Sequence, residues 1–412
     1  MLVAACAALA WLLTRPQTAV LPRQHHPAPR TGDVAVGSRE SAAAGLLARL
    51  TAGLEHGTRR QVLALALPGD PGARRQLGAI FDNVQALHVT GLSMRYVDED
   101  AARLTTAQEQ RLGGHGWVGD VAIGWRIAGY DQGRSSMEVT LTLARTPGNG
   151  AAFVSARGRY GDPAPLWLLD RLTVRRSPRA LVMVADPSRA AGLFRTADQA
   201  VLDVKKVLPG WRGKLVVEMP ATETDLDQML QADPHTYDNI AAVTTTVDGR
   251  MTRSAPTHIF VNPQVFDRLG PEGSQIVVSH EATHVATHAD LSSMPTWLLE
   301  GFADYVALDH VDLPVSVTAS QILAEVRENG PPDHLPTGAD FDPQNQVLGA
   351  TYESAWLACR LLAQEYGEQK LIAFYRQADR DSSTEHAFRD VLHTDKQTFT
   401  QSWEDYLRQL AS

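Results

Sequence analysis

The feature that most constrains this chain is the segment HEATH at residues 280–284. On an α-helix, residues four apart lie on one face, so His280 and His284 can both reach a single tetrahedral metal ion. Glu281 projects about 100° around the helix from His280. Its carboxylate therefore lies beside the metal, where it can act on a water molecule. The segment requires a helix and predicts a metal site on it.

The residues around this segment favour a buried helix. Pro271 suits a first helical turn, and Ile276, Val277 and Val285 supply apolar packing. From the composition of the chain, the pattern His-Glu-x-x-His is expected by chance roughly 0.03 times. Two histidines can also form a hydrogen-bonded pair in a core, so the segment alone suggests a metal site without deciding for one.

A second segment, WLLEGFADY at residues 297–305, follows after a short connection. Ser293 and Pro295 provide a helix start, a capping residue followed by a proline in the first turn. Catalytic zinc takes three protein ligands and keeps one position open, and Glu300 on a second helix would complete that set. Asp304, one turn later, faces the same way and can accept the outer N–H of a ligand histidine. A carboxylate among such apolar neighbours needs a partner, and a metal would provide it.

Together, the two segments closely resemble the gluzincin metallopeptidases, especially the aminopeptidase-N-like and peptidase MA groups. The resemblance covers about residues 180–412 and implies a thermolysin-like α+β catalytic domain. It implies that His280, His284 and Glu300 bind one Zn2+ ion. It also implies that Glu281 is the general base in the zinc-dependent hydrolysis of peptide bonds, with a peptide or protein as substrate.

Two departures from the family bear on specificity. Only 15 residues separate His284 from Glu300, fewer than in the best-known members, and the Gly-x-Met-Glu-Asn-like exopeptidase segment is absent. Endopeptidase action is therefore slightly favoured over aminopeptidase action. Metzincins place a glycine and a third histidine where this chain has Thr287 and Asp290. Asp290 stays a minor alternative ligand, and His288 is interpreted as a neighbour of the site or an exposed residue.

In the resembled family, a tyrosine or histidine beyond the glutamate helix stabilises the oxyanion of the reaction. Tyr352 begins the segment 352–366, which looks like the corresponding helix of the family. The resemblance therefore assigns this role to Tyr352, with Tyr305 and His310 as competitors. A strand predicted at residues 240–247 is interpreted as a sheet edge on which an extended peptide could lie.

The N-terminal region is interpreted as an anchor followed by a tether. Residues 1–14 begin with an apolar run that is shorter than the roughly 20 residues of a membrane-spanning helix and lacks the basic start of a signal peptide. We interpret it as an anchor or a truncated signal or transmembrane segment. Residues 15–40 contain four prolines and predict a linker. We expect a single membrane anchor and an extracytoplasmic catalytic domain.

The rest of the chain predicts two α+β domains, at residues 41–176 and 177–412. In the first, Ser41 is a candidate helix cap, and two helices precede strands expected at residues 87–97, 117–127, 136–145, 152–160 and 163–174. This order of elements is similar to that of the cone-shaped domains of the nuclear-transport-factor-two type. We interpret the expected domain at residues 41–176 as a spacer or docking domain. In the second, strands are expected at residues 180–185, 214–218, 240–247 and 257–262, and helices dominate after Gly270.

Composition sets further limits. A chain with 44% hydrophobic and 21% charged residues is globular, and a net charge of -9 without a long basic run argues against a nucleic-acid partner. The two cysteines lack the close spacing of zinc ligands, and we interpret Cys359 as a small buried apolar residue. No pattern indicates an oligomeric state. Two other functions stay open: a tethered binding or regulatory protein with an inactive peptidase fold, and hydrolysis of a non-peptide amide.

Overall fold

The computed structural model describes residues 33–100, 104–156, 163–309, 311–342 and 345–412. Helices account for 52% of the chain and strands for 18%, in two separate sheets, which confirms the expected α+β class. The expected anchor at residues 1–14 and most of the expected linker at residues 15–40 lie outside the described residues. None of the helices in the described ranges has the length and apolar character needed to cross a membrane.

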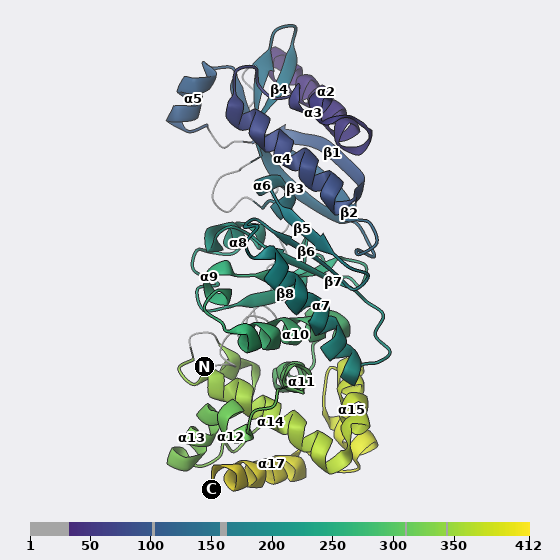
Figure 1. The fold of residues 1–412 in the computed structure, drawn as a ribbon, viewed down its shortest axis with the longest axis vertical. Helices are drawn as coiled ribbons and strands as arrows, with labels where there is room; N and C mark the ends of the chain where they lie inside the picture. The colour runs from purple at the N-terminus through teal and green to yellow at the C-terminus, as the bar shows by residue number, and fades with distance from the viewer. Residues whose placement is uncertain (1–32, 101–103, 157–162, 310, 343–344) are drawn as a thin grey trace.

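The first domain comprises, in chain order, α2 (Asp33–His56), α3 (Arg59–Leu63), α4 (Pro71–Leu87), β1 (Val89–Glu99), α5 (Thr106–Leu112), β2 (Gly116–Ile127), β3 (Ser135–Thr146), β4 (Gly150–Ser155) and α6 (Leu166–Leu169). Its four strands form an antiparallel meander in the order β1-β2-β3-β4, and α2 and α4 pack against it (Figure 1). Leucines of α2 supply part of the core, since Leu46, Leu50 and Leu54 are buried at a helical spacing of four.

Three details of this domain differ from the predictions. The first helix begins at Asp33 instead of Ser41, because no proline lies between Pro29 and Ser41 to stop the helix from extending toward the N-terminus. The strand expected at residues 163–174 is the short helix α6 followed by a strand, since a continuous apolar run does not distinguish the two by periodicity. Residues 139–144 of β3 are all buried, although the alternation of apolar and polar residues there predicts one exposed face; at Ala144 the burial comes from a small apolar cluster with Leu112 of the unpredicted helix α5.

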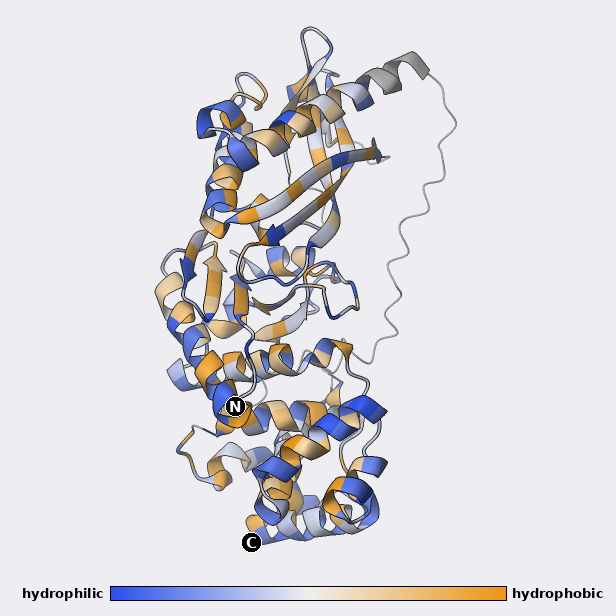
Figure 2. Ribbon diagram, turned by 90° about the vertical axis from the view of Figure 1, so that its right-hand side faces the viewer, coloured by the Kyte–Doolittle hydropathy of each residue, from blue (hydrophilic) through white to orange (hydrophobic). Residues whose placement is uncertain are grey.

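The second sheet is built from β5 (Thr173–Arg176), β6 (Ala180–Val184), β7 (Leu215–Met219), β8 (Ala242–Thr246) and β9 (Thr257–Val261), with α7 (Ala190–Val207), α8 (Glu223–Met229) and α9 (Pro263–Phe266) between or after them. The strand order is β5-β6-β7-β9-β8. The three central strands run parallel, and the two edge strands are antiparallel to their neighbours. Every residue of β6 and β7 is buried, as the mainly hydrophobic colouring of the central strands in Figure 2 illustrates. Because β5 pairs with β6, this sheet begins before the expected domain boundary at residue 177.

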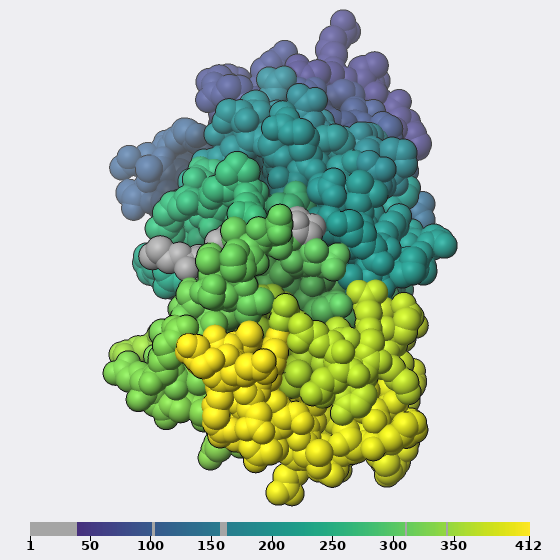
Figure 3. All heavy atoms as spheres, turned by 60° about the horizontal axis from the view of Figure 1, so that its bottom comes forward, coloured from purple at the N-terminus to yellow at the C-terminus, as the bar shows by residue number. Residues whose placement is uncertain are grey.

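The remainder of the chain is helical, as predicted. It contains α10 (Pro271–Thr287), η2 (Ala289–Leu291), α11 (Thr296–Leu308), α12 (Val315–Thr318), α13 (Ser320–Asn329), η3 (Gly338–Phe341), α14 (Leu348–Tyr366), α15 (Glu368–Asp381), α16 (Glu385–Ala387), η4 (Phe388–Leu392) and α17 (Lys396–Ala411). Helix α10 packs beside α7 and against β8 and β9, and α11 lies between α10 and α14. The helices after α11 form the lower end of the molecule, shown from below in Figure 3.

Helices α11 and α14 approach each other closely at Gly301. A Cβ atom at this position would lie 2.3 Å from the carbonyl oxygen of Ala355 and 3.1 Å from the Sγ atom of Cys359. The absence of a side chain at Gly301 therefore sets the distance between the two helices. Cys359 is buried at this contact, as predicted.

A buried histidine joins the two sheets through the hairpin that connects β2 to β3. The Nδ1 atom of His258 in β9 lies 2.6 Å from a carboxylate oxygen of Glu218 in β7. Its Nε2 atom lies 3.0 Å from Oδ1 of Asp131, in the hairpin that connects β2 to β3 of the first domain. Burial lowers the pKa of this imidazole, but the carboxylates of Asp131 and Glu218 outweigh burial and raise the pKa to about 9. Protonated His258 can donate to both carboxylates and so ties the hairpin to the second sheet.

We expect the stabilisation that this contact provides to be lost as the pH rises toward 9. The stabilisation is complete below 6.5, the ordinary pKa of a histidine, because His258 is then protonated in both the folded and the unfolded chain, and it is lost as the pH passes about 9. The shift corresponds to roughly 3 kcal/mol. Thermal unfolding of the wild type and of His258→Gln measures this stabilisation, at pH values about one unit apart between about 6 and 10. The advantage of the wild type should shrink across this window; an advantage that is constant with pH would contradict the assignment.

Candidate metal centre

Helix α10 carries the first predicted segment and is held by hydrogen bonds to α7. It begins with Pro271 in its first turn, as predicted. On the side that faces α7, the Ser279 hydroxyl donates to the buried carboxylate of Asp203 at 2.9 Å, and the Gln275 side chain donates to the same carboxylate at 3.1 Å. The second segment lies on α11, which begins at Thr296. Ser293 does not cap this helix; its hydroxyl lies 2.7 Å from that of Ser382.

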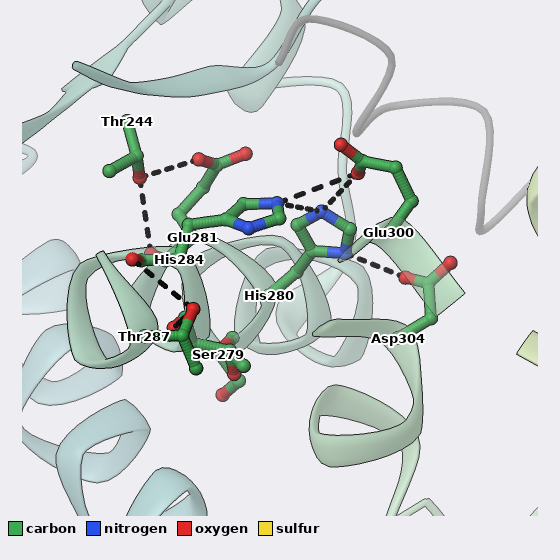
Figure 4. A network of polar contacts seen from close by, with 9 residues as sticks. Thr244, Ser279, His280, Glu281, His284, Thr287, Glu300 and Asp304 are labelled. Carbon is green, nitrogen blue, oxygen red and sulfur yellow. Dashed lines mark hydrogen bonds and ion pairs between the residues drawn. The ribbon is translucent and has the colours of Figure 1, made fainter. Parts of the chain in front are cut away.

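His280, His284 and Glu300 converge on one point, as Figure 4 shows. The two Nε2 atoms are 2.9 Å apart, and a carboxylate oxygen of Glu300 lies 3.1 Å from Nε2 of His280 and 3.5 Å from Nε2 of His284. All three side chains are fully buried. Tetrahedral zinc with bonds of about 2.0–2.1 Å separates its ligand atoms by about 3.3 Å. The three atoms are thus spaced as the corners of one face of such a tetrahedron, and the cluster could hold a metal ion.

Hydrogen bonds and charges around the cluster favour the form of its side chains that binds a cation. Oδ1 of Asp304 lies 2.7 Å from Nδ1 of His280 and accepts a hydrogen bond from it, which leaves the Nε2 lone pair of that ring directed at the cluster. Burial raises the pKa of Glu300, but the adjacent His284 and His280 outweigh burial and lower it to about 2. Within the described part of the chain, Oε1 of Glu300 has no hydrogen-bond partner. A buried carboxylate with an unpaired oxygen and two imidazoles is a donor set that fits zinc.

Glu281 lies beside this cluster without belonging to it. The hydroxyl of Thr244 in β8 donates to its Oε2 atom at 2.7 Å, and its Oε1 atom has no partner among the described residues. Burial raises the pKa of the Glu281 carboxyl, while His284, His280 and Thr244 oppose that rise. The arrangement leaves one carboxylate oxygen available next to the ligand atoms. Thr244 and Asp203 were not predicted, because no sequence pattern links them to α10.

The other predicted residues lie at different distances from the cluster. Tyr352 is buried in α14 with its ring centroid 6.4 Å from that of His280, so the structure brings it to the site. Tyr305 points away, since its hydroxyl donates to Glu368 of α15. Asp290 is outside the three-residue cluster and accepts a hydrogen bond from Thr257. His288 ends α10 in the left-handed conformation. The remaining competitor, His310, lies outside the described residues.

Comparison with protein-family models, with curated proteins and with solved structures finds no match to this chain.

Proposed function

We propose that this chain is a zinc-dependent hydrolase that cleaves peptide bonds, with Glu281 as general base. The observation that carries the proposal is the number of ligands. Within the described residues, three side chains of ligand type converge, which would leave the fourth position of a tetrahedral metal for a reactant. Structural zinc sites are closed by four protein ligands, whereas catalytic ones keep one position for water or substrate.

The groups around the cluster support this proposal. Zinc, when bound, polarises a carbonyl group and lowers the pKa of a water molecule to about 7. Thr244 holds one oxygen of Glu281, so the other oxygen can accept a proton from water and pass it to the leaving nitrogen. Tyr352, beside His280, is suited to donate a hydrogen bond to the developing oxyanion.

The position of β8 favours a peptide as substrate. This strand forms one edge of the second sheet and carries Thr244 on the side that faces Glu281. An extended peptide can pair its backbone with the free edge of a strand, which would bring a scissile bond over the cluster. A peptide is therefore preferred to other amides on structural grounds.

Two measurements on one preparation test the proposal. Elemental analysis of protein purified without chelators should give about one zinc ion per chain. A cleavage screen against peptides from a proteome digest should then yield products that are absent with Glu281→Gln. Zinc without any cleavage would favour a regulatory protein or a non-peptide amide substrate instead.

We expect Asp304→Asn to weaken zinc binding by about 10- to 100-fold, the usual effect of losing the outer partner of a ligand histidine. Asparagine keeps the size of the side chain but removes the charge that orients Nδ1 of His280. Competition with a chelator of known affinity measures the change. An unaltered zinc affinity would show that Asp304 does not support the ligand.

A further inference from the structure

A second potential site lies where the two domains meet. A pocket of about 330 Å³ is bounded by Tyr130 of the β2–β3 hairpin, by the segments that precede β7 and β9, and by His288 at the end of α10. Its volume is at the lower end of the range for small-molecule sites, which occur preferentially at domain interfaces. The metal cluster does not line this pocket.

The pocket gathers positive charge in a chain whose net charge is -9. Arg212, Lys214 and Arg253 line it. Lys214 donates to the carbonyl oxygen of Gly129 at 2.8 Å, and Arg212 donates to that of Pro209 at 2.6 Å. Within the described ranges, none of the three cations is paired with a carboxylate. Other arginines of the second domain, such as Arg179 and Arg189, do have such a partner.

Asp131, which carries the only carboxylate among the described residues that line this pocket, is already engaged. Its Oδ1 atom contacts His258, and its Oδ2 atom accepts a hydrogen bond from the backbone N–H of Ile127 at 2.7 Å. Both carboxylate oxygens of Asp131 are therefore occupied by contacts within the protein. Three cations therefore face the pocket without a carboxylate free to neutralise them.

We propose that this pocket binds the phosphate group of a small anionic ligand. Guanidinium groups present planar sets of N–H donors that match phosphate oxygens, and Arg212 and Arg253 supply two of them. Three positive charges suit a doubly charged phosphate better than a singly charged carboxylate. Lys214 lies over the ring of Tyr130, and the ring of Trp211 offers apolar surface to the rest of the ligand.

The bound ligand would contact both domains and the helix of the metal cluster. Tyr130 belongs to the hairpin that His258 ties to the second sheet, and His288 follows His284 by one turn. Binding there stabilises the docked arrangement of the domains by mass action. The proposal is independent of the proposed hydrolysis, because none of its residues belongs to the metal cluster.

Calorimetric titration of the full chain with inorganic phosphate and with glycerol 3-phosphate tests this site. Ionic strength is held constant with chloride, so that diffuse attraction is the same throughout. We expect saturable binding of one anion, and tighter binding of glycerol 3-phosphate would identify a phosphate ester as the ligand. The double variant Arg212→Ala/Arg253→Ala should weaken binding at least about tenfold.

The matched control is Arg268→Ala, which removes an exposed arginine outside the pocket. It should bind both anions as the wild type does. The two pocket arginines are also exposed, so their replacement should leave the thermal transition without ligand unchanged. The proposal is overturned if neither anion gives saturable binding, or if the control loses as much affinity as the double variant.

Discussion

The Glu281→Gln variant should keep about one zinc ion per chain and lose hydrolytic activity by about 10²- to 10⁴-fold, the usual contribution of a general base. Glutamine matches the size of glutamate and can still contact Thr244, but its amide cannot accept a proton from water. Because Glu281 is not one of the three ligand residues, the metal should stay bound. Steady-state kinetics on a peptide from the cleavage screen, with zinc analysis of the same sample, measures both effects.

The matched control for this variant is Glu272→Gln. Glu272 lies in the first turn of the same helix and is exposed, so its replacement removes the same charge from α10 at a distance from the cluster. It should retain full activity. Full turnover by Glu281→Gln would refute the assignment of the base, and loss of zinc from it would show that this carboxylate helps to hold the metal.

Replacing His284 with alanine should empty the site. Two of the three proposed ligands, His280 and Glu300, remain in this variant, and the shortened side chain leaves a gap where the second imidazole was. We expect zinc to fall from about one ion per chain to less than about a tenth of that after dialysis, with activity lost in parallel. Elemental analysis measures the metal, and circular dichroism confirms that the protein remains folded.

His288→Asn provides the comparison, since it removes a histidine one turn further along the chain. Asparagine tolerates the left-handed conformation that His288 adopts, with φ of 54°, so the end of α10 should be preserved. This variant should keep its zinc. Equal zinc contents in the two variants would mean that His284 is not a ligand.

Local patterns in the sequence were enough to predict the helices that carry the site. The spacing of His280 and His284 follows from helix geometry alone, and the apolar residues around Glu300 correctly indicated that its carboxylate is buried. The edge position of the strand at residues 240–247 was also predicted, and β8 is an edge strand.

The tertiary contacts could not be predicted in the same way. Thr244 reaches Glu281 from 37 residues away, and Asp203 reaches Ser279 from 76 residues away. No periodic pattern in the sequence indicates either pair, because such contacts arise only when other elements of the fold pack against α10. The start of α11 was misplaced for a related reason: Ser293 found a partner in a distant segment instead of capping the helix.

The contact at Gly301 indicates how a related chain could lose the proposed metal site while keeping every residue that would form it. One added methyl group at this position would meet the backbone of α14 and push α11 outward, and Glu300, the preceding residue, would move with it. A homologue with alanine there would still contain both histidines and both glutamates. Those four residues alone would suggest a complete site. The added methyl group at position 301 would nevertheless have moved Glu300 away from the two histidines.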